Sequence, residues 1–115
     1  DKIWGGAGDD DIDAGAGNNE VYGEEGNDDI YAFLGNDVVF GGAGDDFIDA
    51  GKGNNTIEGN DGDDTIVTLE GRQVIYGNAG VDDITTGINN NSLIYGGDGD
   101  DIVFTSGGDA EIYGG

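Results

Sequence analysis

The nonapeptide GGAGDDFID at residues 41–49 decides the fold, because variants of it follow one another along the chain. Starting at Gly5, the successive units read GGAGDDDID, AGAGNNEVY, GEEGNDDIY, AFLGNDVVF, GGAGDDFID, AGKGNNTIE, GNDGDDTIV, TLEGRQVIY, GNAGVDDIT, TGINNNSLIY, GGDGDDIVF and TSGGDAEIY. The fourth place is Gly in every unit except TGINNNSLIY, which has one extra residue near residues 89–91. This period indicates a repeat architecture.

Each unit combines a glycine-rich turn with a short apolar strand. The eighth place is always aliphatic, and it is filled by Ile12, Val21, Ile30, Val39, Ile48, Ile57, Ile66, Ile75, Ile84, Ile94, Val103 and Ile112. We expect places one to six to form the turn and places seven to nine the strand, with place eight inward. A strand this short buries nothing alone, but stacked units bury a continuous ladder. The sequence therefore predicts an all-β parallel β-solenoid in which two units make an 18-residue coil.

Alternate turns differ, as expected if they lie on opposite edges of the solenoid. The acidic edge comprises residues 5–10, 23–28, 41–46, 59–64, 77–82 and 96–101, where each turn begins with Gly and ends with Asp. The neutral edge comprises residues 14–19, 32–37, 50–55, 68–73, 86–92 and 105–110, where no turn begins with Gly. Asp37 is the one Asp at a sixth place there, and the others are Asn19, Asn55, Gln73, Asn91 and Ala110.

The charge of the chain calls for a cationic partner. The 115 residues carry a net charge of −23, with 26 Gly and no Pro, Cys, Met or His. Such a chain is normally disordered, because self-repulsion opposes compaction. The only basic residues are Lys2, Lys52 and Arg72, which excludes a nucleic-acid partner, and no apolar run reaches the roughly 20 residues of a membrane helix. Divalent cations or basic proteins remain as partners.

The acidic edge is the expected cation site. Stacking places its sixth-place carboxylates in one file about 5 Å apart, where like charges repel by roughly 1 kcal/mol per pair even in water. A hard cation with oxygen ligands would cancel this repulsion. Ca²⁺ accepts six to eight oxygens at flexible angles, whereas Mg²⁺ prefers to keep its water, and the lack of His and Cys disfavours zinc, copper and iron. The sequence therefore predicts calcium.

The pattern resembles the GGxGxDxUx nonapeptide, where U is a large aliphatic residue, of the RTX family of haemolysin-type calcium-binding repeats. The closest matches are GGAGDDDID, GGAGDDFID and GGDGDDIVF. The resemblance implies a parallel β-roll with calcium ions between successive turns of one edge. The implied side-chain ligands are Asp10, Asp28, Asp46, Asp64, Asp82 and Asp101. The implied carbonyl ligands are Gly5, Gly6, Gly8, Gly23, Gly26, Gly41, Gly42, Gly44, Gly59, Gly62, Gly77, Gly80, Gly96, Gly97 and Gly99.

Six turns enclose five gaps, so we expect about five full calcium sites, with at most a partial sixth at Gly114 and Gly115. The resemblance further implies a secreted or cell-surface bacterial protein that uses type I secretion and folds on binding calcium. We expect residues 1–115 to be one domain, and a fragment of a longer protein with flanking domains, because the chain begins and stops within repeats.

Two features leave alternatives open. The neutral edge favours an amide ladder over a second calcium row, although the turn of Asp37 could hold a weak site. An outward file of aromatic residues, defined as Trp4, Tyr22, Phe40, Tyr76, Tyr95 and Tyr113 and interrupted by Glu58, either stabilises the sheet or binds a glycan or cell surface. The second choice would make the chain an adhesion, surface-layer or enzyme-accessory module.

Catalysis finds no support in the sequence. Ser92 and Ser106 have no His partner for a hydrolytic triad. Paired carboxylates can cleave glycosides, but here they recur in every coil as a cation row requires. We therefore expect no enzyme activity.

Overall fold

The chain folds into two parallel sheets in a computed structural model, which describes residues 1–88 and 91–115. The seven-stranded sheet contains β1 (Lys2–Ala7), β3 (Glu20–Glu25), β5 (Val38–Ala43), β7 (Thr56–Asp61), β9 (Val74–Ala79), β11 (Ser92–Asp98) and β13 (Ala110–Tyr113). The six-stranded sheet contains β2 (Asp11–Asp13), β4 (Asp29–Tyr31), β6 (Phe47–Gly51), β8 (Thr65–Thr68), β10 (Asp83–Ile88) and β12 (Ile102–Gly107). Odd-numbered and even-numbered strands therefore separate into different sheets.

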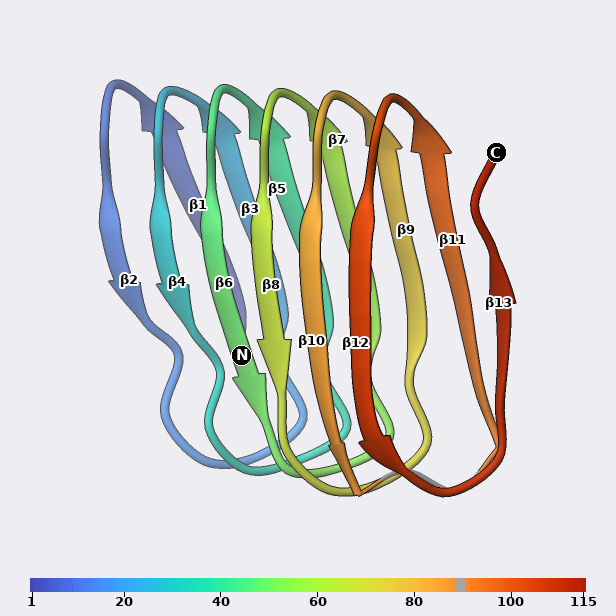
Figure 1. Cartoon of the computed structure of the whole chain (residues 1–115). Coiled ribbons are helices and arrows are strands. Elements are labelled where there is room, and N and C mark those ends of the chain that lie inside the picture. Colours follow the sequence, from blue (N-terminus) through green and yellow to red (C-terminus); the bar gives the residue numbers. More distant parts are fainter. Residues whose placement is uncertain (89–90) are drawn as a thin grey trace.

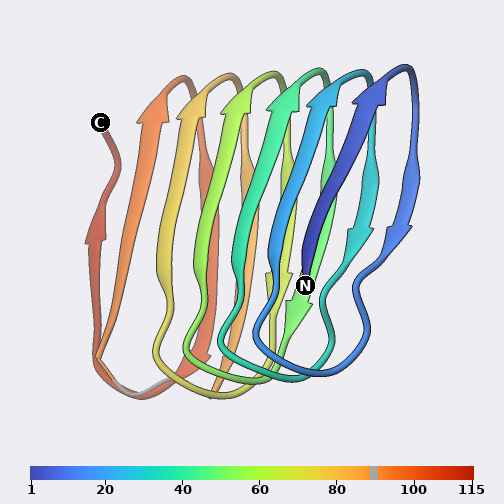
Figure 2. The same ribbon diagram turned by 180° about the vertical axis from the view of Figure 1, so that it is seen from behind.

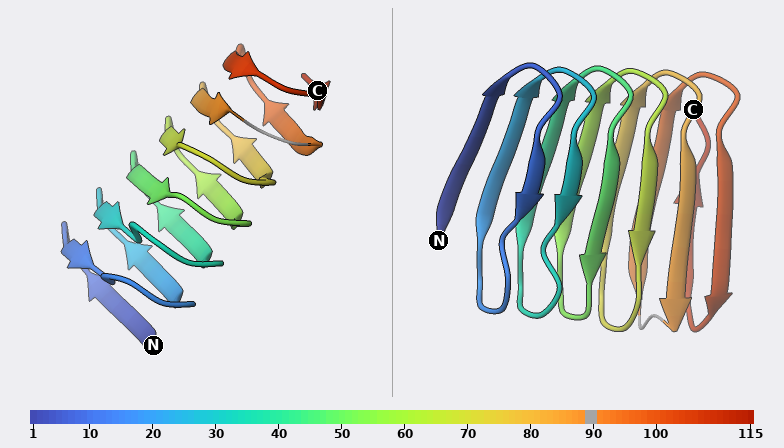
Figure 3. Two further views of the ribbon diagram at one scale, coloured as in Figure 1. Left: turned by 90° about the horizontal axis from the view of Figure 1, so that it is seen from below. Right: turned by 90° about the vertical axis from the view of Figure 1, so that its left-hand side faces the viewer.

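The chain winds as a flat solenoid, because each strand is followed by a strand of the opposite sheet. Figures 1 and 2 show the two sheets from the front and from behind, with the coils in sequence order from blue to red. Figure 3 shows the same coils from below and from one side. The molecule measures 36 × 31 × 14 Å, so it is thin across the two sheets. The predicted parallel β-solenoid of about six 18-residue coils is confirmed.

The register follows the repeat. Ile12 pairs with Ile30 and Ile30 pairs with Ile48, each 18 residues on. Across the longer unit the step becomes 19 residues, as in the pair Ile75 and Ile94. The extra residue therefore does not disturb the pairing of eighth-place residues.

The core is the ladder of these eighth-place side chains between the sheets. Ile30, Ile48, Ile57, Ile66, Ile75, Ile84 and Ile94 are fully buried, as are Val21 and Val39. Burying one such side chain stabilises the fold by about 1.5–3 kcal/mol. Ala32 and Ala50 of the neutral edge, also fully buried, extend the ladder.

The expected boundary between strand and turn is wrong on the acidic edge. The seven-stranded sheet continues into the first three places of the turn, and β5, for example, ends at Ala43. Gly42 pairs with Glu24 although its φ is +128°. Glu24, Asn60 and Asn78 have positive φ at the same place, so backbone pairing maintains this conformation where side-chain propensity alone predicts a turn, and glycine only lowers its steric cost.

Candidate metal sites at the acidic edge

The sixth-place aspartates of the acidic edge form a buried file. Asp28, Asp46, Asp64 and Asp82 are only 1–2% exposed. The Oδ1 atom of each accepts a hydrogen bond from the backbone N–H of the sixth place in the preceding coil, and the Asp46 N–H, for example, donates to Asp64 Oδ1 at 2.9 Å. Asp101 continues this ladder by accepting from the Asp82 N–H at 3.0 Å. The ladder fixes the orientation of each carboxylate.

The second carboxylate oxygen has no hydrogen-bond partner. This holds for the buried Oδ2 atoms of Asp10, Asp28, Asp46, Asp64, Asp82 and Asp101. A buried polar atom without a partner costs about 1–3 kcal/mol, and more when it is charged. Six such atoms in one file therefore require a common explanation.

Each unpaired oxygen lies beside a space that only glycine leaves open. A Cβ atom built on Gly5 would lie 2.8 Å from Asp10 Oδ2 and 2.8 Å from the Gly23 carbonyl oxygen of the next coil. The same pair of oxygens lies within 3.0 Å of the corresponding point at Gly23, Gly41, Gly59, Gly77 and Gly96. We call each of these spaces, bounded by an Asp Oδ2 and a carbonyl oxygen of the next coil, a cradle.

Burial makes the charged form of these aspartates costly. Burial raises the pKa of Asp64 to about 7 and that of Asp46 to about 6, and it also raises the pKa of Asp82. The N–H donated from the preceding coil opposes the shift, whereas neighbouring carboxylates reinforce it. A cation in the cradles would reverse this effect, because it stabilises the ionised form.

The donor set suits Ca²⁺. A cradle brings together a carboxylate oxygen and a backbone carbonyl oxygen from successive coils, and both are ligands of the kind that Ca²⁺ binds. In the described part of the chain, no three acidic side chains converge on one point, so most ligands would be carbonyl oxygens. All ligands available at this edge are oxygens, which Ca²⁺ prefers. The residues present therefore fit the calcium that the sequence predicts.

The glycines named as carbonyl ligands occupy three different places. The first-place glycines present their carbonyl oxygens to the cradle of the preceding coil, and these are Gly23, Gly41, Gly59, Gly77 and Gly96. Gly5 belongs to the first coil, so no preceding cradle receives its carbonyl oxygen. The second-place glycines are Gly6, Gly42 and Gly97, and the fourth-place glycines are Gly8, Gly26, Gly44, Gly62, Gly80 and Gly99. All of these second-place and fourth-place glycines have positive φ. First-place glycines therefore contribute carbonyl oxygens to the cradles, whereas second-place and fourth-place glycines allow the backbone conformation of the turn.

Two features of the acidic edge go beyond the sequence analysis. At the partial sixth site expected there, the Gly114 carbonyl oxygen completes a cradle with Asp101, so the partial seventh turn supplies the same atom as the earlier turns. The fifth place forms a second ladder, in which the Asn27 N–H donates to Asp9 Oδ1 at 2.8 Å and the Asp63 N–H donates to Asp45 Oδ1 at 2.9 Å. The recurrence of Asp and Asn at the fifth place was the available signal.

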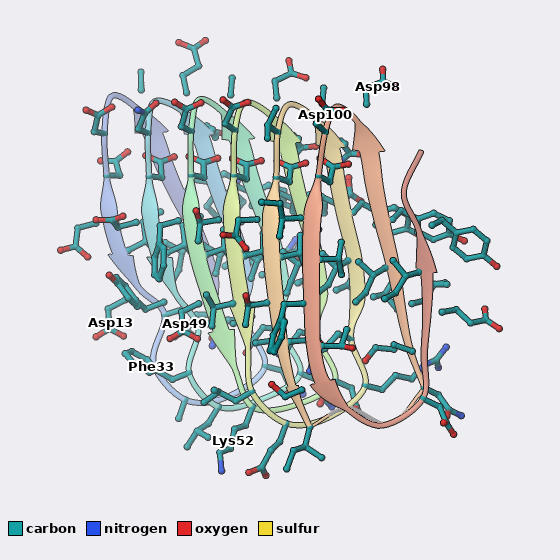
Figure 4. The ribbon with its side chains drawn as sticks, viewed as in Figure 1. Asp13, Phe33, Asp49, Lys52, Asp98 and Asp100 are labelled. Carbon is teal, nitrogen blue, oxygen red and sulfur yellow. The ribbon has the colours of Figure 1, made fainter. Side chains whose placement is uncertain are left out.

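The neutral edge carries part of the expected ladder, with a carboxylate, an amide and a hydroxyl oxygen as acceptors. The Asn19 N–H donates to Asp37 Oδ1 at 2.8 Å, and the Asp37 N–H donates to Asn55 Oδ1 at 2.9 Å. Separately, the Gln73 N–H donates to Ser92 Oγ at 3.0 Å. Ser92, and not Asn91, therefore occupies the sixth place, because the extra residue of this unit precedes it. Figure 4 shows the two opposite rims, with Asp98 and Asp100 on the acidic edge and Phe33 and Lys52 on the neutral edge.

The aromatic file stacks on itself. Trp4, Tyr22 and Phe40 form one stack, with ring centroids 5.8 and 4.9 Å apart, and Tyr76, Tyr95 and Tyr113 form another, with centroids 5.0 and 4.9 Å apart. The planes within these stacks diverge by only 1–13°. The ring faces therefore contact one another along the sheet. Glycan or surface binding by this file stays a prediction.

The comparisons agree with this geometry. The family model HemolysinCabind, described as the RTX calcium-binding nonapeptide repeat (4 copies), matches residues 1–21, 14–48, 22–57, 40–72, 58–93 and 90–112. The chain belongs to this family. It is a family of structural calcium-binding modules, and its repeats occur in secreted bacterial proteins. Searches of curated proteins and of solved structures found no match. The residues that the structure describes include no helix able to cross a membrane.

Proposed function

We propose that this chain is a calcium-dependent folding module of a secreted bacterial protein and holds one row of about five calcium ions along its acidic edge. The observation that carries the proposal is the file of buried Asp Oδ2 atoms without hydrogen-bond partners, each facing a carbonyl oxygen of the next coil. No other feature of the described residues gives those oxygens a partner.

In this proposal, Asp10, Asp28, Asp46, Asp64, Asp82 and Asp101 supply the side-chain ligands. First-place glycines supply carbonyl oxygens from the next coil, and the second-place and fourth-place glycines named above add further carbonyl oxygens. Each ion then joins two successive coils. It stabilises the stack as well as the individual turn.

Binding and folding would be one equilibrium. At a net charge of −23, the metal-free chain lacks the counter-charge that its buried carboxylates need, so the unfolded state should prevail. Five calcium ions would reduce the net charge to about −13. Extracellular calcium modules bind at about 10⁻⁴–10⁻³ M, and this range would keep the chain unfolded inside a cell and folded outside it. Such a switch suits secretion of an unfolded chain by a type I pathway, with flanking domains of the parent protein folding alongside.

A calcium titration of the 115-residue chain, followed by far-ultraviolet circular dichroism, tests the proposal. We expect a disordered spectrum in chelator and a cooperative change to a β-rich spectrum at submillimolar to millimolar calcium. Magnesium at the same concentration is the matched control, and it should leave the spectrum nearly unchanged. A chain that is already β-rich in chelator would show that folding does not need the ion.

A further inference from the structure

The first-place glycines of the acidic edge are not required by the backbone conformation. Gly5, Gly23, Gly41, Gly59, Gly77 and Gly96 all lie outside the positive-φ region, whereas the fourth-place glycines lie within it. A residue with a side chain could therefore adopt the same φ without strain. What it could not do is share the cradle, because its Cβ would lie within 3.0 Å of the Asp Oδ2 and of the next carbonyl oxygen.

The neutral edge carries a β-carbon at this same place in every turn. Its first-place residues are Ala14, Ala32, Ala50, Thr68, Thr86 and Thr105. The turn at residues 32–37 shares several features with an acidic-edge turn. Phe33 and Gly35 have positive φ at the second and fourth places, as Gly42 and Gly44 do. Asp37 occupies the sixth place, its Oδ1 accepts the N–H of the preceding coil, and its Oδ2 is buried without a partner.

We propose that the first-place residue decides whether a turn accepts calcium: glycine leaves the cradle open, and the β-carbon of Ala or Thr closes it. This inference rests on the proposed function, because it assigns a selectivity element to the same row of sites. It explains why an acidic sixth place alone does not make a site. The turn of Asp37 is closed by the methyl group of Ala32.

A second neutral-edge contact adds to this closure. The Asn55 side chain donates from Nδ2 to the Ala50 carbonyl oxygen at 3.1 Å. By its place in the turn, this carbonyl corresponds to the one that Gly41 presents to the cradle of Gly23. The amide hydrogen therefore occupies the acceptor that an ion between the turns of Ala32 and Ala50 would need. Opening a site here requires removing the methyl group and freeing this carbonyl.

Three variants isolate the β-carbon. On the acidic edge, Gly41→Ala keeps every carboxylate but fills one cradle, and the unmodified chain is its control. On the neutral edge, Asn55→Asp frees the Ala50 carbonyl oxygen and adds a carboxylate, but it leaves the methyl group of Ala32. The double variant Ala32→Gly/Asn55→Asp differs from this control only in that methyl group.

Calcium bound per chain, measured by equilibrium dialysis and native mass spectrometry, is the readout. We expect Gly41→Ala to bind one calcium fewer than the unmodified chain. We expect the double variant to bind one more and Asn55→Asp alone to bind no more. If Gly41→Ala fails to fold, the neutral-edge pair still decides the matter.

The two proposals fail in different ways. An unmodified chain that binds no calcium overturns both. An unmodified chain that binds its row overturns only the gating by the β-carbon if Asn55→Asp alone gains an ion, if the folded double variant gains none, or if a folded Gly41→Ala variant binds the full number.

Discussion

Replacing Asp64 with Asn should have opposite effects on the metal-free fold and on the calcium-bound fold. The substitution keeps the shape of the side chain and the Oδ1 atom that accepts the Asp46 N–H. It removes a charge from a group that is 1% exposed and whose Oδ2 has no partner. It also removes one proposed calcium ligand. The metal-free fold should therefore gain stability, whereas calcium should bind less tightly.

The magnitudes follow from burial and from the number of ions. A rise of the Asp64 pKa from 3.8 to about 7 means that ionising this group in the metal-free fold costs up to about 4 kcal/mol at neutral pH or above. Leaving a buried charge without its partner costs about 3 kcal/mol at the lower end of the measured range, and we take this value as the net destabilisation of the calcium-bound fold relative to the unfolded chain. Because about five ions bind together on folding, this loss spreads over the fifth power of calcium concentration and raises the folding midpoint about threefold.

The assay is circular dichroism in two series, one with increasing calcium and one with increasing trimethylamine N-oxide in chelator, because this osmolyte favours compact states. Asp61→Asn is the matched control, since Asp61 lies in the same turn with an exposed side chain. The Asp64 variant should need about threefold more calcium but less osmolyte than the unmodified chain. Equal behaviour of the two variants in both series would refute a specific role for the Asp64 carboxylate.

Three further predictions concern pH, the core and the aromatic file. In chelator and osmolyte, the metal-free fold should lose stability as the pH rises from about 4 to about 7. The reason is that the raised pKa values of Asp46 and Asp64 make the folded state bind more protons than the unfolded state over this range. Stability that stays constant or increases over this range, measured by circular dichroism, would contradict the reasoning. Ile57→Ala should destabilise the calcium-bound fold by about 2–5 kcal/mol, measured by urea unfolding, because Ile57 is fully buried between coils, and an unchanged midpoint would place the core elsewhere. Glu58→Tyr should join the two aromatic stacks and stabilise the fold by about 0.5–1 kcal/mol per new ring pair, and a lower urea midpoint would show that the stacking does not extend across this position.

The repeat made the fold predictable to the level of register. The invariant aliphatic eighth place and the fixed period imply the ladder of Ile30, Ile48 and Ile66, and the structure pairs these residues in that order. The length of the strands was less predictable. Gly41 and Gly42 lie in β5 through backbone pairing that no side-chain preference reveals.

The candidate site was predictable in its acidic residues but not in its geometry. The sixth-place Asp file follows from the alternation of the turns, whereas the unpaired state of each Oδ2 depends on where Oδ1 finds its donor in the neighbouring coil. The sequence also does not separate glycines needed for positive φ, such as Gly44, from glycines needed for space, such as Gly41. At Asn91 and Ser92, several positions could absorb the extra residue, and only the pairing of Gln73 with Ser92 identifies the sixth place.

The extra residue of the longer unit lies on the neutral edge, so the two edges of the solenoid differ in how much change in length they tolerate. The longer unit adds its residue between Thr86 and Ser92, on the neutral edge, while the sixth-place ladder of the acidic edge passes from Asp82 to Asp101 without a break. A coil can therefore change its length on the neutral edge without displacing the carboxylate oxygens of the acidic edge. An array of this kind can diverge by insertion in half of its turns while the remaining half keeps a constant spacing, and the neutral edge is the rim on which a foreign peptide could be grafted.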